Sequence, residues 1–151
     1  MENRGKKYFE DFIPGKIETL GTHSVTSEEI IEYAEKWDPQ PLHIDPDAAK
    51  ESDFGGLIAS GSHVFAIAVR LLVIQKPQVA IIAALECDKV RFTHPVRPGD
   101  VLTLYGECVE TRPSRSKADR GVVRTRITLI NQNGEQVLSF IDIILVLKRS
   151  S

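Results

Sequence analysis

The segment that most limits how this chain can fold runs from Ser62 to about Gln75 and is apolar on nearly every side. Only Arg70 interrupts its apolar side chains, which are Val64, Phe65, Ala66, Ile67, Ala68, Val69, Leu71, Leu72, Val73 and Ile74. A helix without a polar face must be buried by other elements. The rest of the chain is therefore expected to form a layer that wraps around this helix.

The residues after this helix predict that layer, because they follow the two-residue period of β-strands. Strands are expected at 79–93 and 101–111, followed by a polar loop at 112–121 and a third strand over 123–129. A hairpin turn at Asn133-Gly134 leads into the last strand. One face of that strand is expected to carry Val137, Ser139, Ile141, Ile143 and Leu145. Short connections between these four strands predict an antiparallel meander.

The first part of the chain predicts a strand at 16–25 and then a helix. Thr26 and Glu29 have the spacing of a capping box, in which each side chain binds the other residue's backbone N–H. One apolar face of the helix that follows is expected to hold Ile30, Ile31, Ala34 and Trp37. The helix must end before Pro39, because the residue before a proline is disfavoured in the helical conformation.

Residues 38–43 are expected to form a stiff, extended loop, since they contain two prolines. Asp45 and Pro46 are typical of the cap and first position of another short helix, and a loop follows at 52–61. The order of elements indicates one α+β domain over 1–151, with a long central helix packed on an antiparallel sheet.

Composition excludes several classes of function. The 151 residues carry a net charge of −2, so the chain lacks the basic excess of a general nucleic-acid-binding protein. Cys87 and Cys108 give neither a disulfide framework nor a zinc spacing, and no metal is expected. Met1–Lys7 is polar and shows no secretory signal, and the apolar segment is shorter than the roughly 20 residues of a membrane span. We expect a cytoplasmic protein that does not bind membranes.

The loop at 38–43 holds a possible acid–base pair. Asp38 and His43 are separated by a segment that Pro39 and Pro41 stiffen, so their side chains have a fixed relative placement. A carboxylate and an imidazole held at one point can bind a water molecule and exchange protons with it. The alternative is that these residues form an ordinary proline-rich turn.

Gly61 stands at the entrance of the buried helix, where backbone N–H groups lack helical partners. Without a side chain at this position, a substrate carbonyl could approach those donors, which would stabilise an enolate. The alternative is that Gly61 is only part of the helix cap.

Four segments of the chain resemble one known family. Residues 37–61, with Trp-Asp-Pro-Gln-Pro-Leu-His-Ile-Asp and then Gly-Gly-Leu-Ile-Ala-Ser-Gly, resemble the signature of the MaoC-like dehydratases, the (R)-specific enoyl-CoA hydratase (hydratase 2) group. Residues 8–15, 25–30 and 90–100 resemble further motifs of the same family. The sequence departs from the family pattern at Gln40, where Asn is usual, and at Trp37, where Gly is usual.

The resemblance implies a hotdog fold, in which an antiparallel sheet wraps a long helix, and a homodimer with its sites at the subunit interface. It implies that Asp38 and His43 are the catalytic acid–base pair and that the Gly61 N–H polarises a thioester carbonyl. Gln40, Ser60, Ser62 and His63 are expected to contact the substrate, although for His63 the role of a core or interface histidine is favoured. No cofactor is expected beyond the coenzyme A of the substrate.

Two questions stay open at this level. Basic residues in the loop 112–120 or Arg91 and Arg97 could bind coenzyme A phosphates, or could be ordinary solvated side chains. The leading hypothesis is an enoyl-CoA hydratase or 3-hydroxyacyl-CoA dehydratase. The alternatives are a hotdog acyl-CoA thioesterase and a non-catalytic subunit that binds acyl-CoA or serves as a scaffold.

Overall fold

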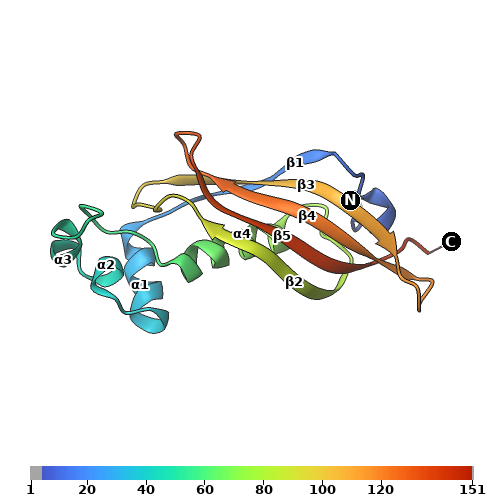
Figure 1. Ribbon diagram of the computed structural model, residues 1–151, viewed down its shortest axis with the longest axis horizontal. Coiled ribbons are helices and arrows are strands. Elements are labelled where there is room, and N and C mark those ends of the chain that lie inside the picture. Colours follow the sequence, from blue (N-terminus) through green and yellow to red (C-terminus); the bar gives the residue numbers. More distant parts are fainter. Residues whose placement is uncertain (1–4, 151) are drawn as a thin grey trace.

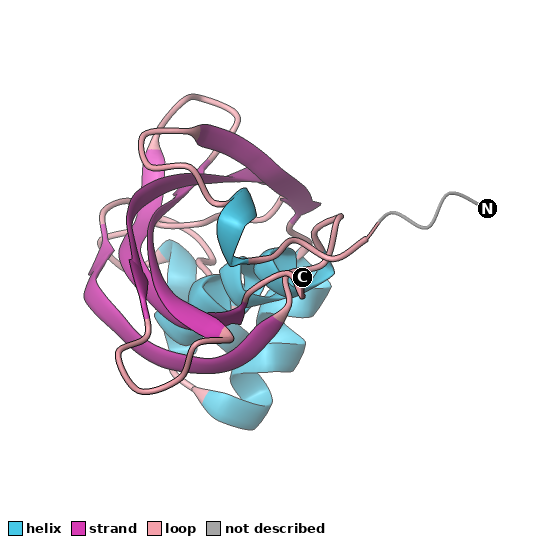
Figure 2. Ribbon diagram, turned by 90° about the vertical axis from the view of Figure 1, so that its right-hand side faces the viewer, coloured by secondary structure: helices cyan, strands magenta, loops and turns pink. Residues whose placement is uncertain are grey.

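A computed structural model describes residues 5–150. Residues 1–4, which belong to the segment expected to lack a secretory signal, and Ser151 lie outside this range. One long helix, α4 (Gly61–Ile74), lies against a five-stranded antiparallel sheet (Figure 1). The strands are β1 (Ile17–Ser24), β2 (Ile81–Phe92), β3 (Val101–Pro113), β4 (Arg120–Ile130) and β5 (Gln136–Leu147). The predicted α+β class is confirmed, and Figure 2 shows the sheet curling around the helices.

The strand order is β1-β3-β4-β5-β2, so the meander holds for β3, β4 and β5 but was wrong for β2. β2 pairs with β5 at the edge of the sheet, and the chain must cross the sheet to reach β3. The segment that makes this crossing is itself buried. Val96 in this segment is 1% exposed, and its carbonyl accepts a hydrogen bond of 2.8 Å from the Ala59 N–H. The connection is thus part of the core and not a tight hairpin.

One side of α4 forms the centre of the core. Val64, Ile67 and Leu71 are buried in the same apolar cluster as Leu104 and Ile127 of the sheet. The expectation that α4 is buried on nearly every side was wrong for the single chain, because three of its large apolar side chains are exposed: Val69, Val73 and Ile74. These residues form an uncovered apolar strip.

The shorter helices α1 (Ser27–Trp37), α2 (Pro41–Ile44) and α3 (Pro46–Lys50) follow β1. The capping box is confirmed, since the Thr26 hydroxyl accepts from the Glu29 N–H and the Glu29 carboxylate accepts from the Thr26 N–H. Asp45 caps α3 as predicted. Trp37, expected on the apolar face of α1, is 65% exposed at the helix end.

The extended loop expected at 38–43 was wrong in its second half, where α2 forms one helical turn. Pro41 is at the start of this turn, a position where its fixed φ and missing N–H suit a helix. Pro41, which was expected to keep the loop extended, therefore begins a new helical turn, and that turn carries His43.

β5 has buried side chains on both of its faces. Leu138, Phe140, Ile144 and Val146 lie on one face and belong to the apolar clusters, and Val137 and Ile143 on the other face are also buried. The strand is apolar on both faces, so alternation could not identify the inner one. As a result Asp142 lies in the inward-facing row, where burial raises the pKa of its carboxyl from 3.8 to about 6.

Replacing Asp142 should make the protein more stable at neutral pH. The folded-state pKa lies above the unfolded value, so the stability of the wild type falls as pH rises from about 4 to 6. We expect Asp142→Asn to raise the free energy of unfolding by up to about 3 kcal/mol at pH 7.5, since two pKa units correspond to this energy. At pH 4 the two proteins should be nearly equal. Urea denaturation at both pH values measures the difference.

The control is Asp53→Asn, on an exposed loop, which should change stability by less than about 0.5 kcal/mol at either pH. A stability difference for Asp142→Asn that does not depend on pH would show that Asp142 is not the titrating group.

Candidate active site

Asp38 and His43 come together where α1 ends and α2 begins. Asp38 is the C-terminal cap of α1, and its N–H donates to the Ala34 carbonyl at 2.8 Å. His43 lies on α2 and is 6% exposed. Its Nε2 atom is 3.6 Å from Oδ2 of Asp38. The two predicted catalytic side chains therefore face each other, one half-buried and one buried.

The ring of His43 is fixed by a hydrogen bond on its other side. Its Nδ1 is 2.8 Å from the carbonyl oxygen of Ile58, which can only accept, so Nδ1 carries the proton. In the neutral ring Nε2 then has a lone pair directed toward Asp38. A distance of 3.6 Å between two acceptors is not a hydrogen bond. A water molecule could donate one hydrogen to each of them.

The carboxylate of Asp38 is held by two donors. The Ser60 hydroxyl donates to Oδ2 at 2.6 Å, and the Gln40 amide donates to Oδ1 at 2.9 Å. Chiefly the Ser60 hydrogen bond, and then that of Gln40, lowers the pKa of Asp38 below its ordinary value of 3.8. Asp38 is therefore ionised at neutral pH and fixed in orientation.

The N-terminus of α4 lies beside this pair, because Ser60 directly precedes Gly61, the first residue of the helix. Ser60 is the N-cap residue, but its side chain donates to Asp38 and does not cap the helix. The first N–H groups of α4 thus keep their capacity to bind a ligand oxygen. A Cβ atom on Gly61 would lie in van der Waals contact with the Phe92 ring of β2, at 3.4 Å.

Ser62 and His63 belong to a second polar cluster, and Ser62 connects this cluster to Asp38 through Ser60. Ser62 accepts a hydrogen bond of 3.1 Å from the Tyr33 hydroxyl, and its Oγ lies 3.0 Å from that of Ser60. His63 is 5% exposed and stacks on the Tyr33 ring at 4.6 Å. Its Nε2 lies 3.3 Å from the Glu29 carboxylate, and burial lowers the pKa of its ring. His63 is therefore a buried core histidine and does not line the candidate site.

Of the predicted site residues, the structure brings together Asp38, Gln40, His43, Ser60 and Gly61. The role of the Ile58 carbonyl could not be predicted, because any residue type can supply a backbone acceptor. Tyr33 was also missed, although it lies one helical turn after Glu29 on α1. An apolar groove begins next to this site and is lined by Tyr33, Ser62, Phe65, Ala66, Val69, Val90 and Phe92.

The basic loop does not reach the site within one chain. β3 and β4 extend further than predicted and shorten the loop to 114–119, which lies at the opposite end of the sheet from α2 (Figure 1). Arg97 is nearer and donates to the Phe54 carbonyl at 2.7 Å. Within residues 5–150 no His, Cys, Asp and Glu side chains are grouped as metal ligands. No helix in this range is long and apolar enough to cross a membrane.

Comparison with known proteins identifies the family. Residues 10–132 match the model of the MaoC-like domain. The chain belongs to the MaoC-like family. A crystal structure of a MaoC-like dehydratase from Rhodospirillum rubrum superposes with a TM-score of 0.85 at 34% identity, and the match covers 95% of this chain and 99% of that one. The hotdog fold implied by the resemblance is confirmed.

Two relatives of this MaoC-like chain have names that describe activities. A 3-hydroxybutyryl-CoA dehydratase of Methylorubrum extorquens is 30% identical over 112 residues, which are 74% of this chain and 69% of that protein. The (R)-hydratase of A. caviae involved in PHA biosynthesis is 25% identical, with a TM-score of 0.68. That match covers 89% of this chain and 97% of the A. caviae chain.

Removing the Ser60 hydroxyl should raise the pKa of Asp38, because the strongest donor to its carboxylate is lost. We expect Ser60→Ala to shift the Asp38 titration upward and Ser60→Thr, which keeps a hydroxyl, to shift it less. Carboxyl carbon NMR shifts followed against pH measure the change. The control is Ser62→Ala, which removes a contact to Ser60 but none to Asp38. An Asp38 titration that Ser60→Ala leaves unchanged would contradict this assignment.

Proposed function

We propose that the protein is an enoyl-CoA hydratase, or a 3-hydroxyacyl-CoA dehydratase in the reverse direction. The observation that carries the proposal is the 3.6 Å gap between two hydrogen-bond acceptors, Oδ2 of Asp38 and Nε2 of His43, beside the N-terminus of α4. One water molecule beside these atoms, about 2.8 Å from each, can donate a hydrogen bond to both, and water is the second substrate of a hydratase. No cofactor is required beyond the coenzyme A of the substrate.

In the hydration direction, the water held between Asp38 and His43 attacks C3 of the enoyl thioester. Nε2 of His43 accepts one proton of the water while the new C–O bond forms. The electron pair of the double bond moves toward the thioester carbonyl, and the Gly61 N–H stabilises the resulting enolate oxygen. The proton on His43 then passes to C2, so that the net reaction adds one water molecule.

Asp38 acts mainly by orienting the water. Its lowered pKa makes the carboxylate a weak base, so it is better suited to accept a lasting hydrogen bond than a proton. Its negative charge also stabilises the imidazolium that forms when His43 takes the proton. The Ile58 carbonyl, which accepts from Nδ1, keeps the ring in the tautomer that this step requires.

The thioesterase alternative requires attack at C1 and a group that leaves as free thiol. Ser60, the hydroxyl closest to the pair, is 1% exposed and donates to Asp38, so it is not available as a nucleophile. A carboxylate that orients the water, beside an imidazole that can take its proton and return it to C2, favours addition to C3. The named activities of the two relatives support the same assignment, and the A. caviae (R)-hydratase supports an (R) product.

The decisive test is a pair of isosteric substitutions, Asp38→Asn and His43→Gln. His43→Gln removes the group that exchanges protons with the water, and a positioned acid or base contributes roughly 10²–10⁴-fold to the rate. Asp38→Asn removes the negative charge that orients the water and stabilises the imidazolium, and we expect a loss of similar size. We expect each variant to lose about that factor in turnover of crotonyl-CoA. Because both residues serve one water, the double variant should lose much less than the product of the two factors. The measurements are loss of enoyl absorbance and release of free thiol, followed in parallel.

Matched controls are Asp119→Asn and His94→Gln, whose side chains are exposed. Both should keep wild-type turnover. His43→Gln also loses the bond to Ile58, so a melting curve must show that it still folds. Thiol release faster than hydration would establish the thioesterase instead. Full turnover in either single variant would remove that residue from the mechanism.

We further propose that two copies of the chain form a homodimer across β2 and α4. β2 is an edge strand with one side unpaired. Of fifteen exposed large apolar side chains in residues 5–150, eight lie on these two elements: Val69, Val73, Ile74, Ile81, Ile82, Leu85, Val90 and Phe92. An unpaired apolar strand next to an apolar helix strip is suited to pairing with its own copy, because a two-fold axis matches the patch to itself.

A charge placed in this patch should dissociate the dimer. We expect Val69→Glu to convert the protein to a monomer of 16.8 kDa at micromolar concentration, as measured by sedimentation. The control is Ile17→Glu, at an exposed apolar position on β1, the opposite edge of the sheet, which should leave the dimer intact. A wild-type protein that sediments as an active monomer would refute the dimer.

A further inference from the structure

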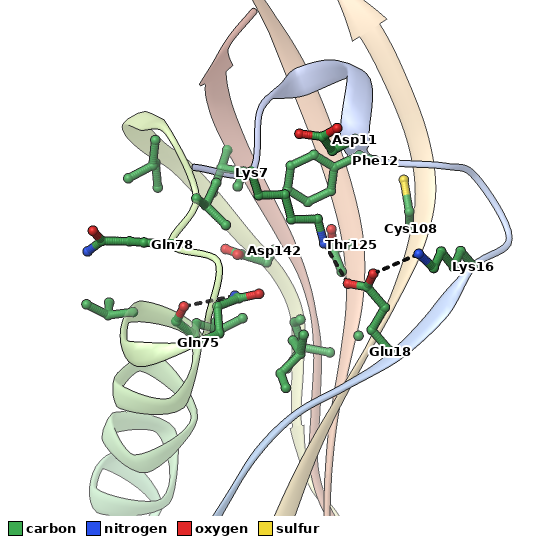
Figure 3. A pocket seen from close by; sticks show the side chains of 18 of the residues that line it. Lys7, Asp11, Phe12, Lys16, Glu18, Gln75, Gln78, Cys108, Thr125 and Asp142 are labelled. Atoms are coloured by element: carbon green, nitrogen blue, oxygen red, sulfur yellow. Dashed lines mark hydrogen bonds and ion pairs between the residues drawn. The ribbon is translucent and has the colours of Figure 1, made fainter. Parts of the chain in front are cut away.

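A cavity of about 130 Å³ lies at the C-terminal end of α4 (Figure 3). The Asp38–His43 pair lies beside the other end of this helix. We call the cavity the distal pocket. It is enclosed by the C-terminal end of α4, the segment 7–18 and the inner face of the sheet. Because α4 has 14 residues, its two ends are about 20 Å apart. None of Asp38, His43 and Gly61 lines the distal pocket.

Most of the wall of the distal pocket is apolar. Its side chains include Phe12, Leu20, Leu72, Val79, Ile127 and Ile144. An apolar cavity of about 150 Å³ can hold a benzene ring, so the distal pocket can accept an apolar body of roughly five or six non-hydrogen atoms.

One carboxyl group enters this apolar space. Asp142 projects from β5 on the inner face of the sheet, on the same side as Thr125 (Figure 3). Its one hydrogen bond to another of residues 5–150 is a long contact of 4.0 Å from the Cys87 thiol. No cation of the described residues forms an ion pair with it. Burial without compensation raises the pKa of Asp142 to about 6.

The other charged groups around the distal pocket already have partners. Glu18 binds both nearby lysines, with Lys7 Nζ at 2.5 Å and Lys16 Nζ at 3.3 Å. Asp11 is paired with Arg149 at 2.7 Å. Asp142 is thus the charge at the pocket that no described residue neutralises. A buried carboxylate is unfavourable until a cation or hydrogen-bond donors pair with it.

We propose that the distal pocket binds a small primary alkylammonium ion, with its ammonium group hydrogen-bonded to Asp142 and its alkyl chain against the apolar wall. The ammonium supplies both the missing charge and three N–H donors. A carboxylate ligand would be repelled by Asp142 and would find the lysines already bound to Glu18. A hydrocarbon would fill the space but leave Asp142 unpaired.

The test compares n-butylammonium chloride with 1-butanol, which has nearly the same shape without the charge. NMR titrations of the full chain at pH 7.5 give the dissociation constants. We expect n-butylammonium to bind at least tenfold more tightly than 1-butanol and to shift resonances of residues around Asp142. In Asp142→Asn the preference should disappear, because both ligands then meet a neutral amide.

Two further variants complete the test. Asp38→Asn should bind n-butylammonium as the wild type does, which separates the distal pocket from the proposed catalytic site. Thr125→Leu narrows the cavity and should weaken both probes. Equal affinity for the two probes in the wild type, a preference that survives Asp142→Asn, or no binding of either probe would overturn the proposal.

Discussion

Burial of one side of α4 against the inner face of the sheet is the constraint on which the other features depend. Strands must curve around the helix to cover it, and β1 and β2 become the two edges of that curve. Because β2 lies on the far edge from β3, the chain between them crosses the core and buries Val96. The same connection holds the segment before α4 through the hydrogen bond between Ala59 and Val96. The entry of the helix is thus fixed by the core.

The fixed start of α4 also determines how Asp38 and His43 are oriented in the candidate site. Ile58 and Ser60 both lie in the segment that enters α4, and they bind His43 and Asp38 respectively. The acid–base pair therefore belongs to α1 and α2, but its orientation is set by backbone and side-chain groups at the start of α4. The helix contributes its N-terminal N–H groups at the same point. The packing of α4 against the sheet therefore sets the positions of the Asp38 carboxylate, the His43 imidazole and the first N–H groups of the helix.

The sequence predicted what depends on local interactions. The capping box of α1, the start of α3 and the long apolar helix each follow from residues a few positions apart. Asp38 and His43 were predicted because their residue types are chemically distinctive. What failed depends on distant partners or on ambiguous patterns: β2 pairs with a strand about fifty residues away, and Pro41, expected to keep the loop after α1 extended, begins α2. The inner face of β5 could not be predicted, because the strand is apolar on both faces. The Ile58 carbonyl could not be predicted, because any residue could supply it.

The two departures from the family pattern can be explained by geometry. Gln40, where Asn is usual, is exposed, and its amide reaches Oδ1 of Asp38 at 2.9 Å, so a longer side chain makes the contact without displacing the loop. Trp37, where Gly is usual, is the last residue of α1, and its side chain is exposed. A side chain at this position therefore displaces nothing in the core. Neither departure removes a hydrogen-bond donor from Asp38 or changes the hydrogen bond from His43 to the Ile58 carbonyl. The chemistry of the pair depends on Ser60 and Ile58, and both remain in contact with it because α4 is buried.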